Sequence, residues 1–238
     1  MYDIALPKDN EEDLVRKYIE NGIKNVVFAY FIENRRDIET FLLNRLPKHK
    51  NLNLFYLAIV NSKKTSETMK LALDLFYSEK YYNDLVFIKS DNLLSSYRIF
   101  GKYFYNGVYI DKIVGNEKFY FRNIDLSSIY KIKKNRQSVL LSLKDALDNP
   151  YPFKYLIKVL SKKDVMIIFG SFASDKSEVP NKYAIKSFYK VFGIDYSLKL
   201  MEEFLFYQIN RTRLAKNKFY FTDGYYIVKM PYEDCSEY

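Results

Sequence analysis

The sequence predicts an α/β protein, a TIM-barrel-like (β/α) barrel that is incomplete or distorted and has about seven mostly parallel strands. Short apolar or aromatic runs alternate with amphipathic stretches along most of the chain. Several of these runs are apolar throughout, as in strands that are buried on both faces of a sheet. Because the 238 residues contain no Ser/Gly-rich linker, we expect a single barrel domain over residues 1–238.

The first strand–helix unit is complete within the first thirty residues. We expect a strand at Tyr2–Leu6, followed by a helix that Asp9 or Asn10 caps and whose first turn is acidic. Gly22 allows a left-handed exit from this helix before the next strand, Val26–Phe31.

The same alternation continues through the middle of the chain. Apolar side chains recur at helical spacing in three further stretches, at about 38–46, 65–76 and 92–100. Between and after them lie the remaining expected strands, Leu54–Val60, Leu85–Ile88, Gly107–Ile110, Val139–Leu143 and Val165–Phe169.

The C-terminal part departs from this pattern. A long helix is expected after Asp195, with its apolar stripe running from Leu198 to Ile209. Phe219–Phe221 and Tyr225–Lys229 then have the character of a terminal hairpin. We expect this segment, about 195–230, to close the barrel.

The composition excludes several classes of function. No apolar run approaches the roughly 18 residues of a membrane span, so we expect a cytoplasmic protein without a membrane partner. Cys235 is the only cysteine and His49 the only histidine, which excludes an internal disulfide and a cysteine-based zinc site. Ser171 follows a predicted strand, but the residue two positions later is not the glycine of a nucleophile elbow, so the sequence does not support acyl transfer.

The charge balance favours a polyanionic partner. The chain has 38 Lys and Arg against 29 Asp and Glu, a net charge of +9, together with 24 Tyr and 19 Phe that could stack on bases. Cations lie in the loops at both ends of the expected strands, so the sequence leaves open which end of the barrel meets a partner.

Ten basic residues are our candidates for RNA contact. They form two dense clusters and three positions in loops after strands: Lys131, Lys133, Lys134 and Arg136; Arg211, Arg213 and Lys216; and Arg35, Arg36 and Lys89. The alternative for the first cluster is a solvated turn. The alternative for the second is a set of cations that complements the dipole at a helix C-terminus.

A metal site would have to be built from carboxylates. Asp3, Asp91, Asp111 and Asp145 fall at or beyond predicted strand ends, and an oxygen-only magnesium site is the alternative they leave open. Because a two-metal site without histidine is uncommon in such barrels, we expect no metal and no cofactor on this chain.

From about Asp111 onward the chain resembles ribonuclease P protein component 3, the barrel subunit of the archaeal and eukaryotic tRNA-processing ribonucleoprotein. The likeness lies in the order and spacing of several segments: Asn123–Asn135, Ser138–Leu147, Val165–Ala173, a proline-started helix at Pro180, Phe192–Ile194, Asn210–Arg213 and Gly224–Val228. Family members commonly have an arginine just before that proline, whereas this chain has Glu178 and Val179 there.

The resemblance implies a non-catalytic subunit of ribonuclease P. Such a subunit binds the ribonuclease P RNA and precursor tRNA, assists removal of the 5′ leader, and forms a heterotetramer with protein component 2. In this family the RNA supplies catalysis, so magnesium is expected on the RNA component only. Related phosphoesterase barrels carry a His-x-His pair near the first strand, where this chain has Asp3–Ala5. The alternatives are a stand-alone metal-dependent phosphoesterase of the same barrel class and an interaction module without RNA.

Overall fold

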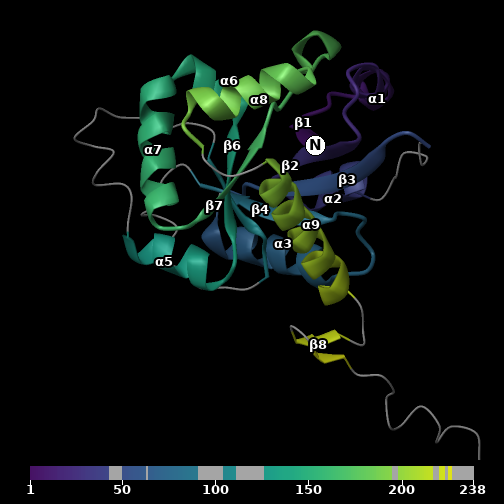
Figure 1. Cartoon of the computed structure of the whole chain (residues 1–238). Helices are drawn as coiled ribbons and strands as arrows, with labels where there is room; N and C mark the ends of the chain where they lie inside the picture. The colour runs from purple at the N-terminus through teal and green to yellow at the C-terminus, as the bar shows by residue number, and fades with distance from the viewer. Residues whose placement is uncertain are drawn as a thin grey trace, which may run out of the picture.

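The computed structural model describes residues 1–42, 50–62, 64–90, 104–110, 126–194, 198–216, 220–222 and 225–226. Its centre is a seven-stranded sheet in the order β1-β2-β3-β4-β5-β6-β7, with every neighbouring pair parallel (Figure 1). The sheet curls into a nearly closed barrel with helices on its outside, which confirms the predicted fold class.

The strands agree with the sequence prediction to within one residue at each end. Their apolar runs are buried on both faces, because one face of the sheet points into the packed interior of the barrel and the helices cover the other. The strands are β1 (Tyr2–Ala5), β2 (Asn25–Ile32), β3 (Asn53–Val60), β4 (Leu85–Lys89), β5 (Gly107–Ile110), β6 (Ser138–Ser142) and β7 (Met166–Gly170).

The outer helices follow the strands in sequence. They are α1 (Glu11–Glu20), α2 (Arg35–Leu42), α3 (Thr65–Tyr77), α5 (Leu126–Lys134), α6 (Leu143–Asp148), α7 (Pro150–Lys162), the 3₁₀ turn η1 (Lys176–Glu178) and α8 (Lys182–Val191). The helix expected at Asn92–Phe100 lies outside the described residues. None of the described helices is long and apolar enough to cross a membrane.

Polar side chains cap two helices at points where the structure differs from the sequence prediction. The Ser142 hydroxyl accepts a hydrogen bond from the Asp145 amide at 3.2 Å, so the chain turns into α6 at Leu143 instead of continuing as a strand. The Asn181 side chain accepts from two amides of the first turn of α8, which therefore begins at Lys182 and not at Pro180.

The barrel closes at an irregular seam between β1 and the residues after β7. The Phe172 amide donates to the Ile4 carbonyl at 2.8 Å, and the Leu6 amide donates to the Ala173 carbonyl at 2.9 Å. Gly170 permits this approach, because a Cβ at that position would lie 2.4 Å from the Ile4 Cβ.

The Asp3 carboxylate extends the seam where backbone pairing is missing. Its Oδ1 accepts the Ser171 amide at 2.8 Å, and its Oδ2 accepts the Ser171 hydroxyl at 2.6 Å and the Tyr18 hydroxyl at 2.7 Å. The side chain thus links β1 to the residue that follows β7 and to α1.

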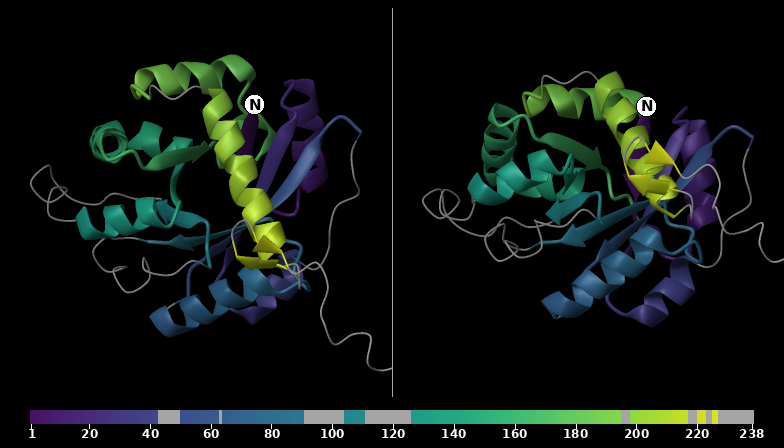
Figure 2. Two further views of the ribbon diagram at one scale, coloured as in Figure 1. Left: turned by 60° about the horizontal axis from the view of Figure 1, so that its bottom comes forward. Right: turned by 90° about the horizontal axis from the view of Figure 1, so that it is seen from below.

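Helix α9 (Leu198–Ala215) crosses the end of the barrel at which the strands begin (Figure 2). The strands β8 (Tyr220–Thr222) and β9 (Tyr225–Tyr226) pair antiparallel in a sheet of their own, so within the described residues they add no strand to the barrel. That residues 1–238 form one domain closed by this segment stays a prediction.

Candidate functional site

Buried polar groups hold α9 on the amino end of the barrel. Asn106, directly before β5, donates to the Gln208 carbonyl at 3.1 Å and to the Gln208 Oε1 at 3.0 Å. Its own Oδ1 accepts from the Val86 amide at 2.7 Å and from the Thr212 hydroxyl at 3.0 Å. Asn106, Gln208 and Thr212 are all fully buried. Since buried polar groups are costly without partners, this network fixes the position of α9.

The C-terminal turns of α9 are tied to the strand starts by cations. Arg213 forms an ion pair with the buried Asp84 at 2.7 Å. The Lys216 ammonium donates to the Tyr81 carbonyl at 2.7 Å and to two oxygens of Asn83 at 2.8 and 2.9 Å. Two of the candidate RNA contacts therefore also hold the fold together, which the spacing of charges in the sequence could not show.

The structure brings the two basic clusters side by side. The Gln208 side chain donates to the Arg136 carbonyl, the Arg211 guanidinium to the Asn135 carbonyl at 3.4 Å, and the Arg136 guanidinium to the Tyr207 hydroxyl at 3.5 Å. The turn after α5 thereby lies against α9, although these segments are more than 70 residues apart in the sequence.

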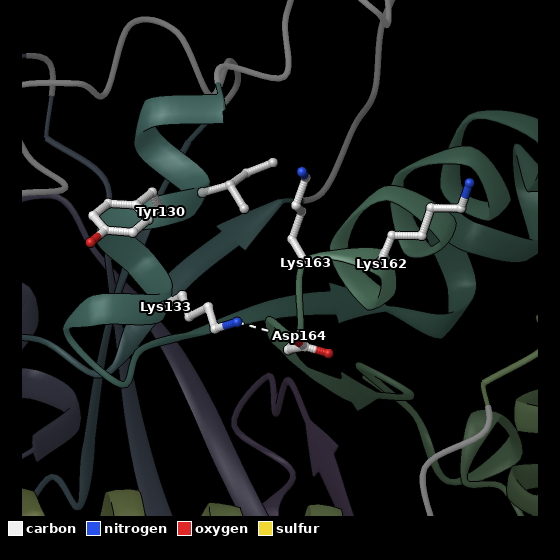
Figure 3. Close-up of a pocket in the computed structure, with 6 residues that line it drawn as sticks. Tyr130, Lys133, Lys162, Lys163 and Asp164 are labelled. Atoms are coloured by element: carbon white, nitrogen blue, oxygen red, sulfur yellow. Dashed lines mark hydrogen bonds and ion pairs between the residues drawn. The ribbon is translucent and has the colours of Figure 1, made fainter.

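A hollow of about 320 Å³ opens next to this junction, between α5 and α7. Tyr130, Ile129 and Lys133 line it from α5, and Lys162, Lys163 and Asp164 line it from the end of α7 (Figure 3). Lys133 forms an ion pair with Asp164 at 3.0 Å.

Together these groups form a basic surface at the amino end of the barrel. We call it the amino-end surface and define it by Lys131, Lys133, Lys134, Arg136, Lys162, Lys163, Arg211, Arg213 and Lys216. Arginine forks and lysine ammonium groups both suit phosphate oxygens, so these side chains are of the kind that binds a nucleic-acid backbone.

The other three candidate residues lie at the opposite, carboxyl end of the strands. Arg35 and Arg36 are exposed in the first turn of α2. The Lys89 ammonium lies 5.8 Å from the centre of the Phe31 ring. The ten candidates therefore divide between two ends of the molecule.

Aromatic rings fill the lumen at the carboxyl end. Tyr109 stacks on Phe172 with ring centres 5.0 Å apart, and its ring centre also lies 5.8 Å from that of Phe31. Tyr109 and Phe172 are buried. This is the end where (β/α) barrel enzymes carry their active sites.

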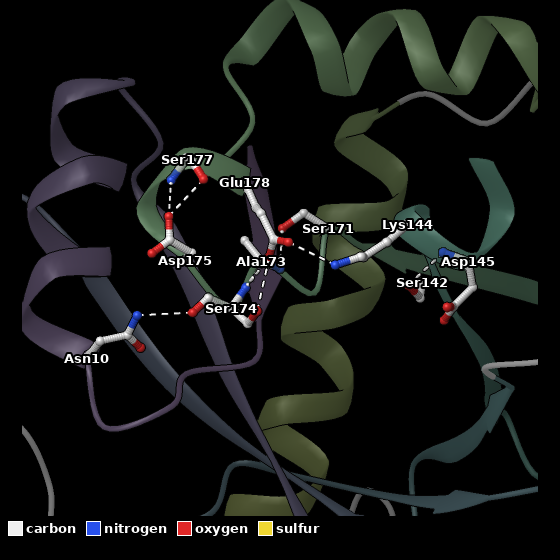
Figure 4. A network of polar contacts seen from close by, with 10 residues as sticks. All are labelled: Asn10, Ser142, Lys144, Asp145, Ser171, Ala173, Ser174, Asp175, Ser177 and Glu178. Atoms are coloured by element: carbon white, nitrogen blue, oxygen red, sulfur yellow. Dashed lines mark hydrogen bonds and ion pairs between the residues drawn. The ribbon is translucent and has the colours of Figure 1, made fainter. Parts of the chain in front are cut away.

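A polar network links the first turn of α6 to the residues after β7 at the same end (Figure 4). Lys144 binds Glu178 at 2.8 Å, and the other Glu178 oxygen accepts from the amide and hydroxyl of Ser174 at 2.8 and 3.1 Å. The hydrogen bond from Lys144 is the main cause that lowers the pKa of Glu178 to about 2. Glu178, near the position where the resembling family has arginine, thus joins the segment after β7 to α6.

The candidate metal-ligating carboxylates do not gather at one point. Burial raises the pKa of Asp3, and Ser171 and Tyr18 already bind both of its oxygens. Asp145 lies in the first turn of α6. Within the described residues no group of three or more His, Cys, Asp or Glu side chains is placed to hold a metal ion. Asp91, Asp111, His49 and Cys235 lie outside the described residues.

Comparison with known proteins identifies similar folds. No family model matches the chain, and no curated protein matches its sequence. A chain in the cryo-EM structure of archaeal ribonuclease P with mature tRNA is 14% identical with a TM-score of 0.69, over 98% of this chain and 100% of that chain. A histidinol phosphate phosphatase from Lactococcus lactis, crystallised with zinc, L-histidinol and phosphate, is 10% identical with a TM-score of 0.50, over 81% of this chain and 93% of that chain.

Proposed function

We propose that this chain is a protein subunit of ribonuclease P, of the component 3 kind, that binds the RNA and assists removal of the 5′ leader from precursor tRNA. The observation that carries the proposal is the match of the fold, over almost its whole length, to a chain of archaeal ribonuclease P. The amino-end surface supports it with charge suited to an RNA backbone.

In this role the chain contributes charge and shape, and the RNA contributes catalysis. Lysine and arginine side chains of the amino-end surface neutralise phosphates and release their counterions, so binding weakens steeply as salt rises. Magnesium belongs to the RNA component, and the chain itself carries no cofactor. Protein component 2 is the proposed protein partner, in a heterotetramer, and the cytoplasm is the proposed location.

A metal-dependent phosphoesterase is the second candidate, because the phosphatase shares the barrel. The carboxyl end favours the first proposal. There the Tyr109–Phe172 stack fills the lumen, and both carboxylate oxygens of Asp3 already accept hydrogen bonds at the seam. A phosphoester and its metal ions would need that space and those oxygens.

Reconstitution separates the two candidates. The chain, with ribonuclease P RNA and the other protein subunits, is mixed with precursor tRNA, and 5′ leader release is measured with and without this chain. We expect its omission to lower leader release, and we expect the isolated chain to cleave nothing with magnesium, manganese or zinc. Metal-dependent hydrolysis by the isolated chain, lost in the Asp3→Asn and Asp145→Asn variants, would establish the phosphoesterase instead.

A further inference from the structure

We propose that the hollow between α5 and α7 binds an unpaired nucleotide of the RNA. The Tyr130 ring stacks on the base, and Lys162 and Lys163 bind the adjoining phosphates. This inference rests on the proposed function and adds to it the structural class of RNA that the amino-end surface selects.

Tyr130 presents its ring to solvent from a firmly anchored helix. Its side chain is 67% exposed, while the preceding residue, Ile129, is buried in the core at 1% exposure. Because the ring is exposed, its face is available for a base to stack on. The hollow of about 320 Å³ beside the ring has room for a base.

The opposite wall of the hollow supplies two cations. Lys162 and Lys163 are exposed at the end of α7 and line the hollow on the side opposite α5; in Figure 3 the Lys162 side chain extends away from Tyr130, and Lys163 lies between the two. The turn that follows is tight: Asp164 has a left-handed backbone with a φ of 54°, and the Val165 amide closes back on the Leu160 carbonyl at 3.1 Å.

The one acid among the described residues that line the hollow is already paired. Asp164 is bound by Lys133 at 3.0 Å, so its negative charge is compensated from the α5 side. This leaves the positive charge of Lys162 and Lys163 to face an incoming phosphate.

The pairing of a ring with cations favours single-stranded over double-stranded RNA. Lysines alone bind the phosphates of either form, whereas a ring can stack only on a base whose face is exposed. Tyr130 should therefore contribute to binding of unpaired segments and not to binding of a blunt duplex.

The test compares two RNAs of equal length, a single-stranded oligonucleotide and a blunt duplex, by fluorescence anisotropy with the full chain. We expect Tyr130→Ala to weaken binding of the single strand about tenfold and to leave the duplex unchanged. Tyr130→Phe keeps the ring and should bind as the wild type does. Tyr151→Ala, at an 82% exposed tyrosine at the other end of α7, is the matched control and should change neither affinity.

The lysines are tested by salt dependence. Lys162→Ala with Lys163→Ala should reduce the slope of log affinity against log salt for the single strand by about 0.7 for each lost contact.

Equal single-strand binding by wild type and Tyr130→Ala overturns this inference alone, as does a loss in Tyr130→Phe equal to that in Tyr130→Ala. Loss of binding to protein component 2 in Tyr130→Ala, with RNA binding intact, also overturns it and makes the hollow a protein contact. The proposed function is also contradicted if the wild-type chain binds neither RNA and if leaving the chain out of the reconstituted ribonuclease P does not change leader release.

Discussion

Arg213 and Asp84 join the last long helix to the barrel across 129 residues of sequence. The Arg213 Nε and Nη2 both lie 2.7 Å from the Asp84 Oδ1. Asp84 is only 2% exposed, and its Oδ2 accepts the Tyr56 amide of β3 at 2.9 Å. One carboxylate thus connects α9 with β3 and with the start of β4.

Removing the arginine should destabilise the protein. In Arg213→Ala the buried Asp84 loses its cation, and we expect the free energy of unfolding to fall by about 1.5–3 kcal/mol. Adding Asp84→Asn removes the uncompensated charge and keeps an acceptor for the Tyr56 amide, so the double variant should be more stable than Arg213→Ala. Urea unfolding measures both, and a double variant no more stable than the single one would contradict the prediction.

The end of the barrel that meets RNA can be identified by matched charge removal. Lys131→Ala with Lys134→Ala removes two charges from the amino-end surface, and Arg35→Ala with Arg36→Ala removes two from the carboxyl end. We expect the first pair to lower the salt slope of RNA binding by about 0.7–0.9 for each lost contact, and the second to change it little. The opposite order would place the RNA at the carboxyl end.

Arg211 offers a separate test of the predicted arginine contacts. Arg213 is committed to Asp84, so replacing it changes stability as well as charge. Arg211 contacts the Asn135 carbonyl and lies 5.7 Å from the centre of the Phe76 ring. We expect Arg211→Ala to weaken RNA binding more than Lys186→Ala, which removes one charge from α8. Equal losses in titrations of ribonuclease P RNA would show that Arg211 acts only through net charge.

Gly170 should tolerate no side chain. In Gly170→Ala the new methyl group meets the Ile4 Cβ at 2.4 Å, so the seam must open, at a cost near the upper end of the range of about 1–3 kcal/mol. The control is Gly193→Ala, where no atom lies within 4 Å and only the φ of +64° is strained, at about 1 kcal/mol. Chemical denaturation of both variants tests this, and equal losses would mean that the seam adapts.

Asp3 should make stability depend on pH in the direction opposite to that of a salt-bridged acid. Burial raises its pKa in the folded state above the unfolded value of about 3.9. The folded protein then binds more protons in this window, so the contribution of Asp3 to stability falls as pH rises from about 3.9 through the folded pKa, and is constant above it.

The Asp3→Asn variant isolates this effect. It cannot ionise, so its free energy of unfolding relative to wild type should increase with pH across that window. Unfolding measured at several pH values between 4 and 8 provides the test. A difference between the two proteins that stays constant with pH would show that the folded pKa of Asp3 is not raised.

The strands could be predicted from sequence because burial on both faces leaves a direct signature. The run from Leu54 to Val60 and the run from Leu85 to Ile88 contain hardly any polar residue, and each coincides with a strand. The end of the strand before Leu143 and the start of the helix at Lys182 differ from the prediction because a single capping side chain decides each, and Ser142 and Asn181 look like ordinary strand or turn residues.

The site was predictable only in part. Charge density identified the two basic clusters, but their proximity depends on Gln208 and Asn106, whose partners lie 72 and 102 residues away. From the sequence alone, a polar residue in a buried hydrogen-bond network cannot be distinguished from one in a solvated loop. Tyr130 likewise becomes notable only when its exposure and its neighbours from α7 are known.

The placement of α9 constrains how the protein is made. Its contacts reach the residues before β4, β5 and β6, and it follows all seven barrel strands in sequence. During synthesis all seven barrel strands must therefore leave the ribosome before α9 can cover the amino end of the barrel. Contacts between residues so far apart in sequence also form slowly. Asp84 and Asn106, being polar, keep the uncovered strand ends compatible with water in that interval, where apolar residues would expose a surface prone to aggregation.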